Sequence, residues 1–314
     1  MELRILKTFV AFLGFVLLSS CTKEVKIDIP GYKEQLVVDG SIREGEPPIV
    51  LLSTSQNIYA PTDITAYLSS FVGDAEVIVS DGTNTVTLSK ICTDNLPQGT
   101  EAYAEAIFGM SIQELQQLPS PLCIYTSFDP LIFGQVGKTY SLTINHKGKT
   151  YTSATKIEPP VALDYLKWKL EPNQNSLGYL YGYMTDNPAT ADNFMWEMKN
   201  ISDPFFTKPY GPFFNDDFFN GLAFEFALYN PMSYEDSTFS EEELGYFKQN
   251  DTVVLRLSRI GDNEYNFFNK KWNQIYSAGS PFATPVNVPS NIVGGALGVW
   301  AGYSSFLDTV ICQP

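Results

Sequence analysis

The stretch from Tyr140 to Thr155 reads YSLTINHKGKTYTSAT. Tyr140, Leu142 and Ile144 alternate with polar residues, and this period of two is typical of a β-strand with one buried face. Asn145-His-Lys-Gly148 supplies turn residues, and the β-branched segment Thr150–Thr155 follows it. The stretch therefore predicts a β-hairpin that contributes Tyr140, Leu142 and Ile144 to a core.

Short strand-like segments continue on both sides of this hairpin. Ala75–Ser80 leads through Asp81-Gly82 into Thr85–Leu88, which predicts a second hairpin. Glycine, proline, asparagine and aspartate punctuate the remaining segments, a pattern that favours antiparallel sandwiches. The other predicted strands are Leu36–Ile42, Ile49–Ser55, Tyr165–Leu170, Tyr179–Met184, Phe194–Met198, Leu222–Phe226 and Thr252–Ser258.

A domain border is predicted near residue 160, where Glu158-Pro-Pro-Val161 interrupts the strand pattern. Consecutive prolines cannot continue a β-ladder and stiffen the chain into an extended link. The prediction is a mainly β protein of two antiparallel β-sandwich-like domains. The first spans residues 33–158 and is immunoglobulin-like, and the second spans 162–314 and is rich in aromatic residues.

Short helices are expected within this β framework. Ser111-Ile-Gln-Glu114 has the pattern of a capping box and opens a helix that reaches Leu118. In the second half, Ser240–Glu243 caps a helix to about Lys248, and Asp262 or Asn263 caps another over Glu264–Ser277. The last helix places four aromatic residues on one face: Tyr265, Phe268, Trp272 and Tyr276.

The N-terminus reads MELRILKTFVAFLGFVLLSSC and is typical of a targeting segment. Arg4 and Lys7 precede a short apolar run, and Leu18-Ser-Ser-Cys21 resembles a bacterial lipobox. The pattern predicts a signal peptide over residues 1–20, acylation of Cys21 and a lipidated leader over 21–32. An ordinary secretory signal or a membrane helix with a chance cysteine is the alternative. No later stretch approaches about 18 consecutive apolar residues, the length of a membrane helix.

The charge of the chain excludes some classes of partner. It has 20 basic and 35 acidic residues, and removal of Glu2, Arg4 and Lys7 with the signal peptide would leave a net charge of −16. Nucleic-acid binding needs basic surface that neutralises phosphate, so no nucleic-acid partner is expected. Docking on anionic lipid by charge is disfavoured for the same reason.

Three cysteines follow Cys21 in the chain. Cys92 and Cys123 bracket residues 93–122, and each borders strand-like sequence. Outside the cytoplasm they can form a disulfide across this excursion, and two buried free thiols are the alternative. Cys312 is left over.

The sequence offers few groups for catalysis or metal binding. Its one histidine, His146, falls in the predicted hairpin turn, where we expect exposure, and zinc sites of the common types need more ligands. Asp216 and Asp217, and the run Glu241–Glu243, could bind Ca²⁺ or act as an acid/base pair, but a solvated acidic face is the simpler interpretation. We therefore expect no enzyme, no catalytic residues, no metal and no cofactor.

Two further segments are unusual. Asp203–Gly221 holds seven aromatic residues among three prolines, and either folds back onto the second core or forms an exposed contact patch. Within the patch interpretation, Tyr210, Phe213 and Phe214 are the expected exposed members. Gly294-Gly-Ala-Leu-Gly298 indicates close packing or a bulge in a strand.

The order of the motifs resembles a known family. Together they resemble the Bacteroidota lipoproteins grouped as domain of unknown function 4249. The motifs are the lipobox, Gln35–Ile42, Pro47-Pro48 before Val50–Ser53, Val72–Gly82, Gly137–Ile144, Lys149–Ser153, Pro159-Pro160, Pro281-Phe282 and Val288–Trp300.

This resemblance implies an outer-membrane lipoprotein, often encoded beside a TonB-dependent receptor, with no catalytic residues to transfer. It also implies that the first half is similar to the small prealbumin-like sandwiches of such receptors. In such lipoproteins, acidic residues after the lipidated cysteine favour export to the cell surface. Lys23-Glu24 supplies only one acid near Cys21, so the cell surface and the periplasmic face both stay open.

The expected function is that of an accessory to a TonB-dependent receptor in nutrient capture or uptake. Its partners would be the outer membrane, through the lipid on Cys21, and the receptor. The aromatic segment and the region Asn291–Trp300, with Trp300, would form the contact face. The alternative is a stand-alone surface module that binds a glycan or peptide. A hydrolase that uses the Asp216–Asp217 pair is a more distant alternative, and the sequence does not identify a ligand.

Overall fold

The computed structural model describes residues 32–57, 63–232, 240–277 and 287–314. One compact unit comprises Glu34–Ser55 and Thr62–Pro314, and it holds the strands and helices of the described residues. The predicted signal peptide, Cys21 and nearly all of the predicted leader lie outside the described residues. None of the helices in the described ranges combines the length and the apolar character needed to cross a membrane.

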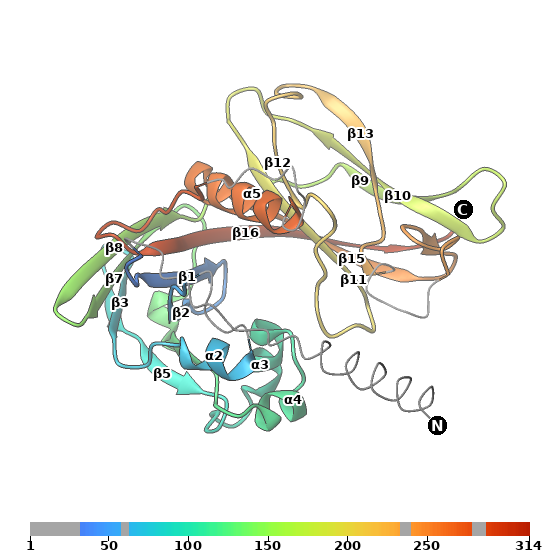
Figure 1. Cartoon of the computed structure of the whole chain (residues 1–314). Coiled ribbons are helices and arrows are strands. Elements are labelled where there is room, and N and C mark those ends of the chain that lie inside the picture. The colour runs from blue at the N-terminus through green and yellow to red at the C-terminus, as the bar shows by residue number, and fades with distance from the viewer. Residues whose placement is uncertain (1–31, 58–62, 233–239, 278–286) are drawn as a thin grey trace, which may run out of the picture. The chain divides into compact units, whose positions relative to one another are not determined.

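An eight-stranded mixed sheet joins the two halves of the chain (Figure 1). Neighbouring strands in it are antiparallel except β1 and β16, which are parallel, so the expectation of purely antiparallel sheets is wrong here. β1 and β16 can pair in parallel because they come from opposite ends of the described chain. No short hairpin turn joins them, and such a turn would force an antiparallel arrangement. The order is β12 (Phe213–Asn215), β11 (Asn193–Asn200), β15 (Thr252–Ile260), β16 (Leu297–Ile311), β1 (Leu36–Arg43), β2 (Ile49–Thr54), β6 (Cys123–Thr126) and β5 (Ser89–Cys92).

Two smaller sheets are antiparallel throughout. The first has the order β4 (Thr85–Thr87), β3 (Glu76–Ser80), β7 (Thr139–His146) and β8 (Lys149–Lys156). The second contains β9 (Tyr165–Leu170), β10 (Leu177–Thr185), β13 (Ala223–Leu228) and β14 (Phe247–Lys248), with β10 paired to the other three. The strands predicted from period-two patterns are therefore confirmed.

The hairpin predicted over Tyr140–Thr155 is formed by β7 and β8. Tyr140, Leu142 and Ile144 are buried, as their alternation predicts. Lys147 and Gly148 both have positive φ and form the two-residue turn that pairs His146 with Lys149. Local turn chemistry and alternation together determine this element.

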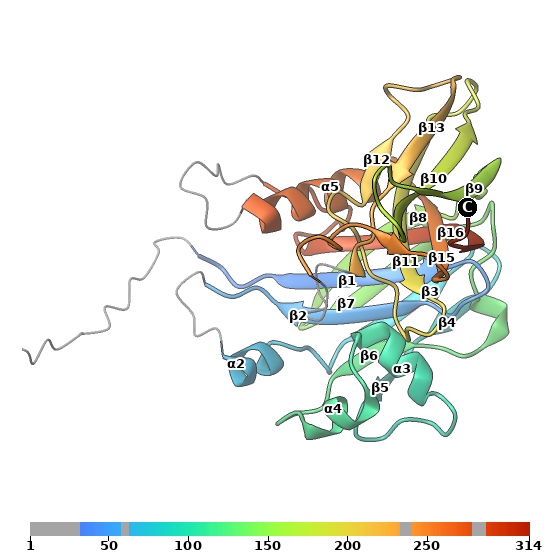
Figure 2. The same cartoon turned by 90° about the vertical axis from the view of Figure 1, so that its right-hand side faces the viewer.

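Each small sheet packs against a different part of the large sheet. Ile42 and Val50 of the large sheet share a core cluster with Val79 and Leu142 of the first small sheet. Met198 and Leu255 share another cluster with Trp168 and Leu180 of the second, which Figure 2 shows gathered above β15 and β16. The result is two sandwich-like halves that share one sheet.

The predicted border near residue 160 falls between β8 and β9, where the chain leaves one small sheet and enters the other. The large sheet does not stop there, because it takes β1, β2, β5 and β6 from before the border and β11, β12, β15 and β16 from after it. The border therefore separates the small sheets but not the large one.

Helices cover parts of this framework: α2 (Ile64–Ser69), α3 (Glu101–Phe108), α4 (Ile112–Gln117), the 3₁₀ turn η1 (Pro130–Ile132) and α5 (Asp262–Ser277). The predicted capping box is confirmed, since the Ser111 N–H donates to Glu114 Oε2 and the Glu114 N–H donates to Ser111 Oγ. The helix predicted from Ser240 is wrong. Gly245 adopts positive φ and ends the turn there, and β14 follows directly.

Cys92 and Cys123 form a disulfide between directly opposed positions of β5 and β6. The excursion that it closes holds α3 and α4, whose buried Ala104 and Leu115 form a small core of their own with Leu68 of α2. On the chain-entropy model, closing a loop of this length stabilises the fold by about 3–4 kcal/mol. Cys312 is buried, and burial raises the pKa of its thiol to about 12.

Glycine at position 298 permits the parallel pairing of β16 with β1. Gly298 has φ of +108°, and a Cβ at this position would lie 1.9 Å from the carbonyl oxygen of Val38. This agrees with the close packing that the glycine-rich segment indicates. Further along β16, Trp300 is fully buried and its Nε1–H donates to the Tyr140 carbonyl at 2.9 Å, which ties the strand to the first small sheet.

Glu197 is the centre of a buried charge cluster on β11. Its carboxylate accepts a 2.7 Å hydrogen bond from Arg256 Nε of β15, lies 3.0 Å from Lys208 Nζ and lies 4.0 Å from Arg43 Nη2 of β1. Burial by itself raises the pKa of Glu197, but the charges of Lys208, Arg256 and Arg43 lower it to about 2. The cluster thus links strands from both halves of the chain.

Substitution of Gly298 tests the close approach of β16 to β1. Gly295 also has positive φ, but a Cβ added there would meet no atom within 4 Å, so Gly295→Ala isolates the backbone strain of about 1–3 kcal/mol. We expect Gly298→Ala to cost at least about 1–3 kcal/mol more, because overpacking adds to that strain. Urea unfolding of both variants measures the difference, and equal losses would contradict the steric explanation.

Acidification tests the Glu197 cluster. Because the folded pKa of about 2 lies below the ordinary 4.5, the carboxylate contributes stability above about pH 4.5 and loses it as the pH falls towards 2. Glu197→Gln should therefore cost about 3 kcal/mol at pH 7, since it leaves three cations without their carboxylate, and less at pH 3. Urea unfolding at both pH values provides the measurement, with the exposed Glu242→Gln as control. A stability gap that does not change with pH would refute this role.

Candidate functional site

The outer face of the second small sheet carries a row of tyrosines. In β10 the residues Leu180 and Met184 point into the second core cluster, whereas Tyr179, Tyr181 and Tyr183 alternate with them and are half-buried on the opposite face. A strand with one face on the core presents the other face to the exterior. The period of two in Tyr179-x-Tyr181-x-Tyr183 places the three tyrosines on one face of a strand. From the sequence this pattern predicts the strand, but it does not show that the face with the tyrosines is the outer one.

Neighbouring strands widen this row. Tyr165 of β9 lies opposite Tyr183, and their rings stack with centroids 5.0 Å apart. At the other end Tyr179 contacts Tyr246 and Tyr229, with ring centroids 4.6 and 5.4 Å away. We call these six residues the tyrosine face: Tyr165, Tyr179, Tyr181, Tyr183, Tyr229 and Tyr246.

Charged side chains are interleaved with the rings. Lys167 Nζ lies 4.5 Å from the ring centroid of Tyr165, and Lys169 Nζ lies 4.0 Å from that of Tyr181. Both lysines form ion pairs with Glu225 of β13, which also accepts a 3.0 Å hydrogen bond from the Tyr165 hydroxyl. The hydrogen bond from Lys169 lowers the pKa of Glu225 to about 2, so this carboxylate is charged at physiological pH.

The chemistry of the tyrosine face suits recognition. Tyrosine offers a large apolar ring and a hydroxyl that donates or accepts a hydrogen bond, and tyrosine is enriched at protein interfaces. Four of the six rings are carried by the paired strands β9 and β10, so little of their conformational freedom is lost when a partner binds. The arrangement therefore provides a preorganised contact surface.

The predicted aromatic segment packs partly against the fold, since one of its seven aromatic residues is buried, four are partly buried and two are exposed. Tyr210 is 80% exposed, as expected, and its ring meets Tyr276 of α5 edge-on at 4.9 Å. Phe213 and Phe214 are not exposed contacts, because successive residues of β12 point to opposite faces and both faces are covered. Phe213 stacks on Phe268 of α5, and Phe214 stacks on Phe194.

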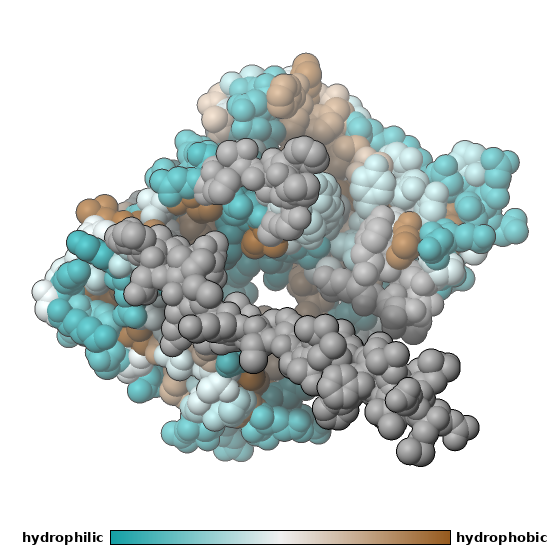
Figure 3. Space-filling view, in the orientation of Figure 1, coloured by the Kyte–Doolittle hydropathy of each residue, from teal (hydrophilic) through white to brown (hydrophobic). Residues whose placement is uncertain are grey.

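Trp300 is also excluded as a contact residue, because it is fully buried in the first core cluster. Instead, Phe218 in the β12–β13 connection is 95% exposed. In Figure 3 hydrophobic atoms gather at the top of the molecule, over the region of this connection in Figure 1. Phe218 was not among the predicted contacts, because nothing in its local pattern distinguishes it from Phe219.

His146 does not occupy an exposed turn. It is the last residue of β7 and points to the same side as Tyr140, Leu142 and Ile144, so it is buried. Its Nε2 lies 3.1 Å from Asp74 Oδ1. The turn itself is made by the two residues that follow it.

The acidic candidates separate in the structure. Asp217, Glu241 and Glu242 are exposed, which agrees with a solvated face. Asp216 is only 3% exposed and departs from that interpretation. The local sequence could not distinguish it from its neighbour Asp217, since burial here depends on the contact of two separate loops.

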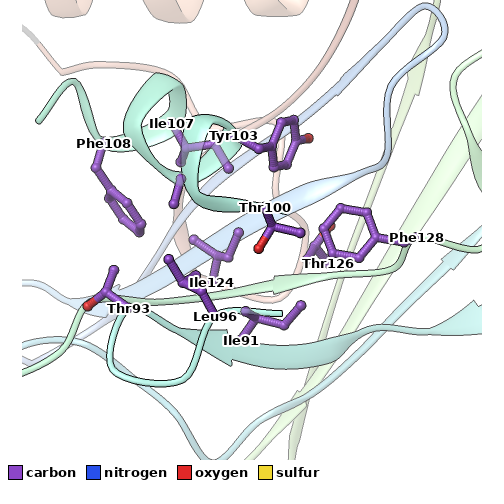
Figure 4. Close-up of a pocket in the computed structure, with 11 residues that line it drawn as sticks. Ile91, Thr93, Leu96, Thr100, Tyr103, Ile107, Phe108, Ile124, Thr126 and Phe128 are labelled. Carbon is purple, nitrogen blue, oxygen red and sulfur yellow. The ribbon is translucent and has the colours of Figure 1, made fainter. Parts of the chain in front are cut away.

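A small apolar pocket lies beneath α3 (Figure 4). Its cavity volume of about 20 Å³ is enough for a water molecule and far below that of a pocket for an organic ligand. The Tyr103 hydroxyl nearby is buried without a hydrogen-bond partner in the described residues, and burial raises the pKa of Tyr103. We therefore do not assign ligand binding to this pocket. Its walls are formed by Ile91, Thr93, Leu96, Thr100, Tyr103, Ala104, Ile107, Phe108, Ile124, Thr126 and Phe128.

Comparison with known proteins identifies one family. A family model described as "Domain of unknown function (DUF4249)" matches residues 22–306, which is most of the chain. No curated protein and no solved structure matches this chain.

Proposed function

Because the chain belongs to the DUF4249 family, we propose that it is a lipid-anchored accessory protein of an outer-membrane TonB-dependent receptor. In this proposal residues 1–20 direct export, acyl chains on Cys21 anchor the protein, and the folded unit acts by binding rather than by catalysis. The resemblance of its motifs to Bacteroidota lipoproteins supports the anchor and the receptor.

The tyrosine face is the observation that carries this proposal. It combines tyrosine rings, which are enriched at protein interfaces, with Glu225 and two lysines, charged groups of the kind found at the polar rim of an interface. Of the four contact residues expected from the sequence, Tyr210 is exposed, whereas Phe213 and Trp300 are buried and Phe214 is partly buried. A protein partner is consistent with the acidity of the chain, because an acidic folded unit has little affinity of its own for anionic lipid.

Direct binding of a glycan is the second candidate, because sugars stack on tyrosine rings. Two ring faces already carry lysine ammonium groups, those of Tyr165 and Tyr181. A sugar would have to displace them at the cost of two cation–π contacts, each about 0.5–1 kcal/mol at exposed sites. A protein partner can bind over the same surface and keep them, so we favour the protein partner.

Substitution of Cys21 tests the anchor. Cys21→Ser should reduce incorporation of labelled palmitate to background and release the protein from membranes, because each buried methylene contributes roughly 0.8 kcal/mol to anchoring. Detergent phase partition measures the release. Cys312→Ala provides the control, since its thiol is buried and should carry no lipid. Full labelling of Cys21→Ser would overturn the lipoprotein assignment.

Substitution of the tyrosine face tests the partner. The tagged protein should recover a TonB-dependent receptor from outer membranes in gentle detergent. Tyr181→Ala with Tyr183→Ala should reduce recovery roughly thirtyfold or more, because a hot-spot tyrosine contributes about 2 kcal/mol. Tyr67→Ala is the matched control, since Tyr67 is exposed on α2, outside this sheet.

Two outcomes of this experiment would contradict the proposal. Recovery of the protein alone at several detergent strengths would remove the stable receptor partner. In that case, an isolated sugar or peptide that quenches the tryptophan fluorescence of the wild type but not of the double variant would favour the stand-alone binding module. Equal recovery of receptor by the double variant would show that another surface makes the contact.

A further inference from the structure

Three buried aspartates meet at one end of the second half of the fold. Asp186 follows the end of β10, Asp192 precedes β11, and Asp216 follows β12. One carboxylate oxygen from each lies within 4.8 Å of one from each of the others. Their exposures are 4, 2 and 3%, so water does not solvate these charges freely.

Hydrogen bonds or ion pairs with protein groups already occupy several carboxylate oxygens of this cluster. Asp186 Oδ2 accepts from the Gly221 N–H at 2.7 Å, and Asp216 Oδ2 accepts from the Asp192 N–H at 2.9 Å. Asp192 Oδ2 accepts from the Thr190 hydroxyl at 3.0 Å, and Asp192 Oδ1 pairs with Arg259.

Asp186 Oδ1 is different. It is buried and has no hydrogen-bond partner in the described residues. A buried acceptor without a partner costs about 1–3 kcal/mol, and more when it is charged. Since Asp186 Oδ2 is already engaged with Gly221, Oδ1 is the oxygen of this carboxylate that is available to a ligand.

The charges in the cluster do not balance. Within the described residues, the pair of Asp192 with Arg259 is the one ion pair that the three aspartates form, so Asp186 and Asp216 have no cationic partner there. Like charges at this separation in a dry environment repel strongly. The two unmatched negative charges equal the charge of one divalent cation.

We propose that Asp186, Asp192 and Asp216 bind a divalent cation, and that this cation is Ca²⁺. All three side chains offer oxygen, the donor that hard cations prefer, and the cluster has no histidine or cysteine for zinc or softer metals. Three converging carboxylates in loops, with irregular spacing, suit the flexible coordination of Ca²⁺ better than the strict octahedron of Mg²⁺.

Ca²⁺ bound by these three aspartates would join two loops that are separate in sequence. Asp186 and Asp192 belong to the β10–β11 connection, and Asp216 begins the β12–β13 connection that exposes Phe218. The two connections already touch through the Gly221 N–H and the Asp192 N–H. Bound Ca²⁺ would hold them in place beside the end of β10, the strand that carries Tyr179, Tyr181 and Tyr183.

Calorimetric titration of the full chain with CaCl₂, after chelator treatment and dialysis, tests this proposal. We expect one site per chain and a higher unfolding temperature with Ca²⁺ than with chelator. Asp186→Asn should weaken Ca²⁺ binding at least about tenfold, because it removes a ligand charge without changing shape. Asp217→Asn, at the exposed neighbour outside the cluster, should bind like the wild type.

Stability without metal distinguishes a metal site from a structural cluster. In chelator, Asp186→Asn should be at least as stable as the wild type, because it relieves repulsion that no cation offsets. Absence of Ca²⁺ binding by the folded wild type would overturn the proposal, as would equal binding by Asp186→Asn. Binding of Mg²⁺ as tight as that of Ca²⁺ would overturn the assignment to calcium. If Asp186→Asn fails to fold, the wild-type titration alone decides.

Discussion

The parallel pairing of β16 with β1 is the constraint on which the rest of this structure depends. β16 bonds to β1 on one edge and to β15 on the other, so it connects strands of the first half of the chain to strands of the second. Trp300 near its start lies in the first core cluster, and Phe306 and Val310 pack against the second. One 15-residue strand therefore passes between both cores, and the small sheets can pack only where it positions the large one.

Two clusters of buried charge in the described residues have opposite imbalance. Around Glu197 three cations surround one carboxylate, whereas in the aspartate cluster three carboxylates converge and one of them pairs with Arg259. The first cluster lies across strands of the large sheet, keeps its carboxylate ionised and reaches the surface through half-exposed Lys208. The second lies between loops and leaves a buried oxygen without a partner in the described part of the chain. This difference is why the first is interpreted as a structural link and the second as a cation site.

The proposed contact surface depends on the same framework. Tyrosines on a strand present their rings in a row only because Leu180 and Met184, which alternate with them, are fixed in the core. Lys167, Lys169 and Glu225 then order the rings through cation–π contacts and ion pairs from both neighbouring strands. The proposed cation site at the end of β10 would add a second support, because it joins the loops next to this strand.

Local patterns in the sequence were sufficient for much of the secondary structure. Alternation located the strands, turn residues located the β7–β8 hairpin, and the Ser111–Glu114 capping box located α4, because each depends on residues within a few positions of one another. The tertiary structure alone decided the parallel partner of β16, the burial of Phe213, Trp300 and Asp216, and the exposure of Phe218. These outcomes depend on which element covers each face, and that element comes from a distant part of the chain. A period-two pattern shows that a strand has two faces, but it cannot show whether one or both of them will be covered.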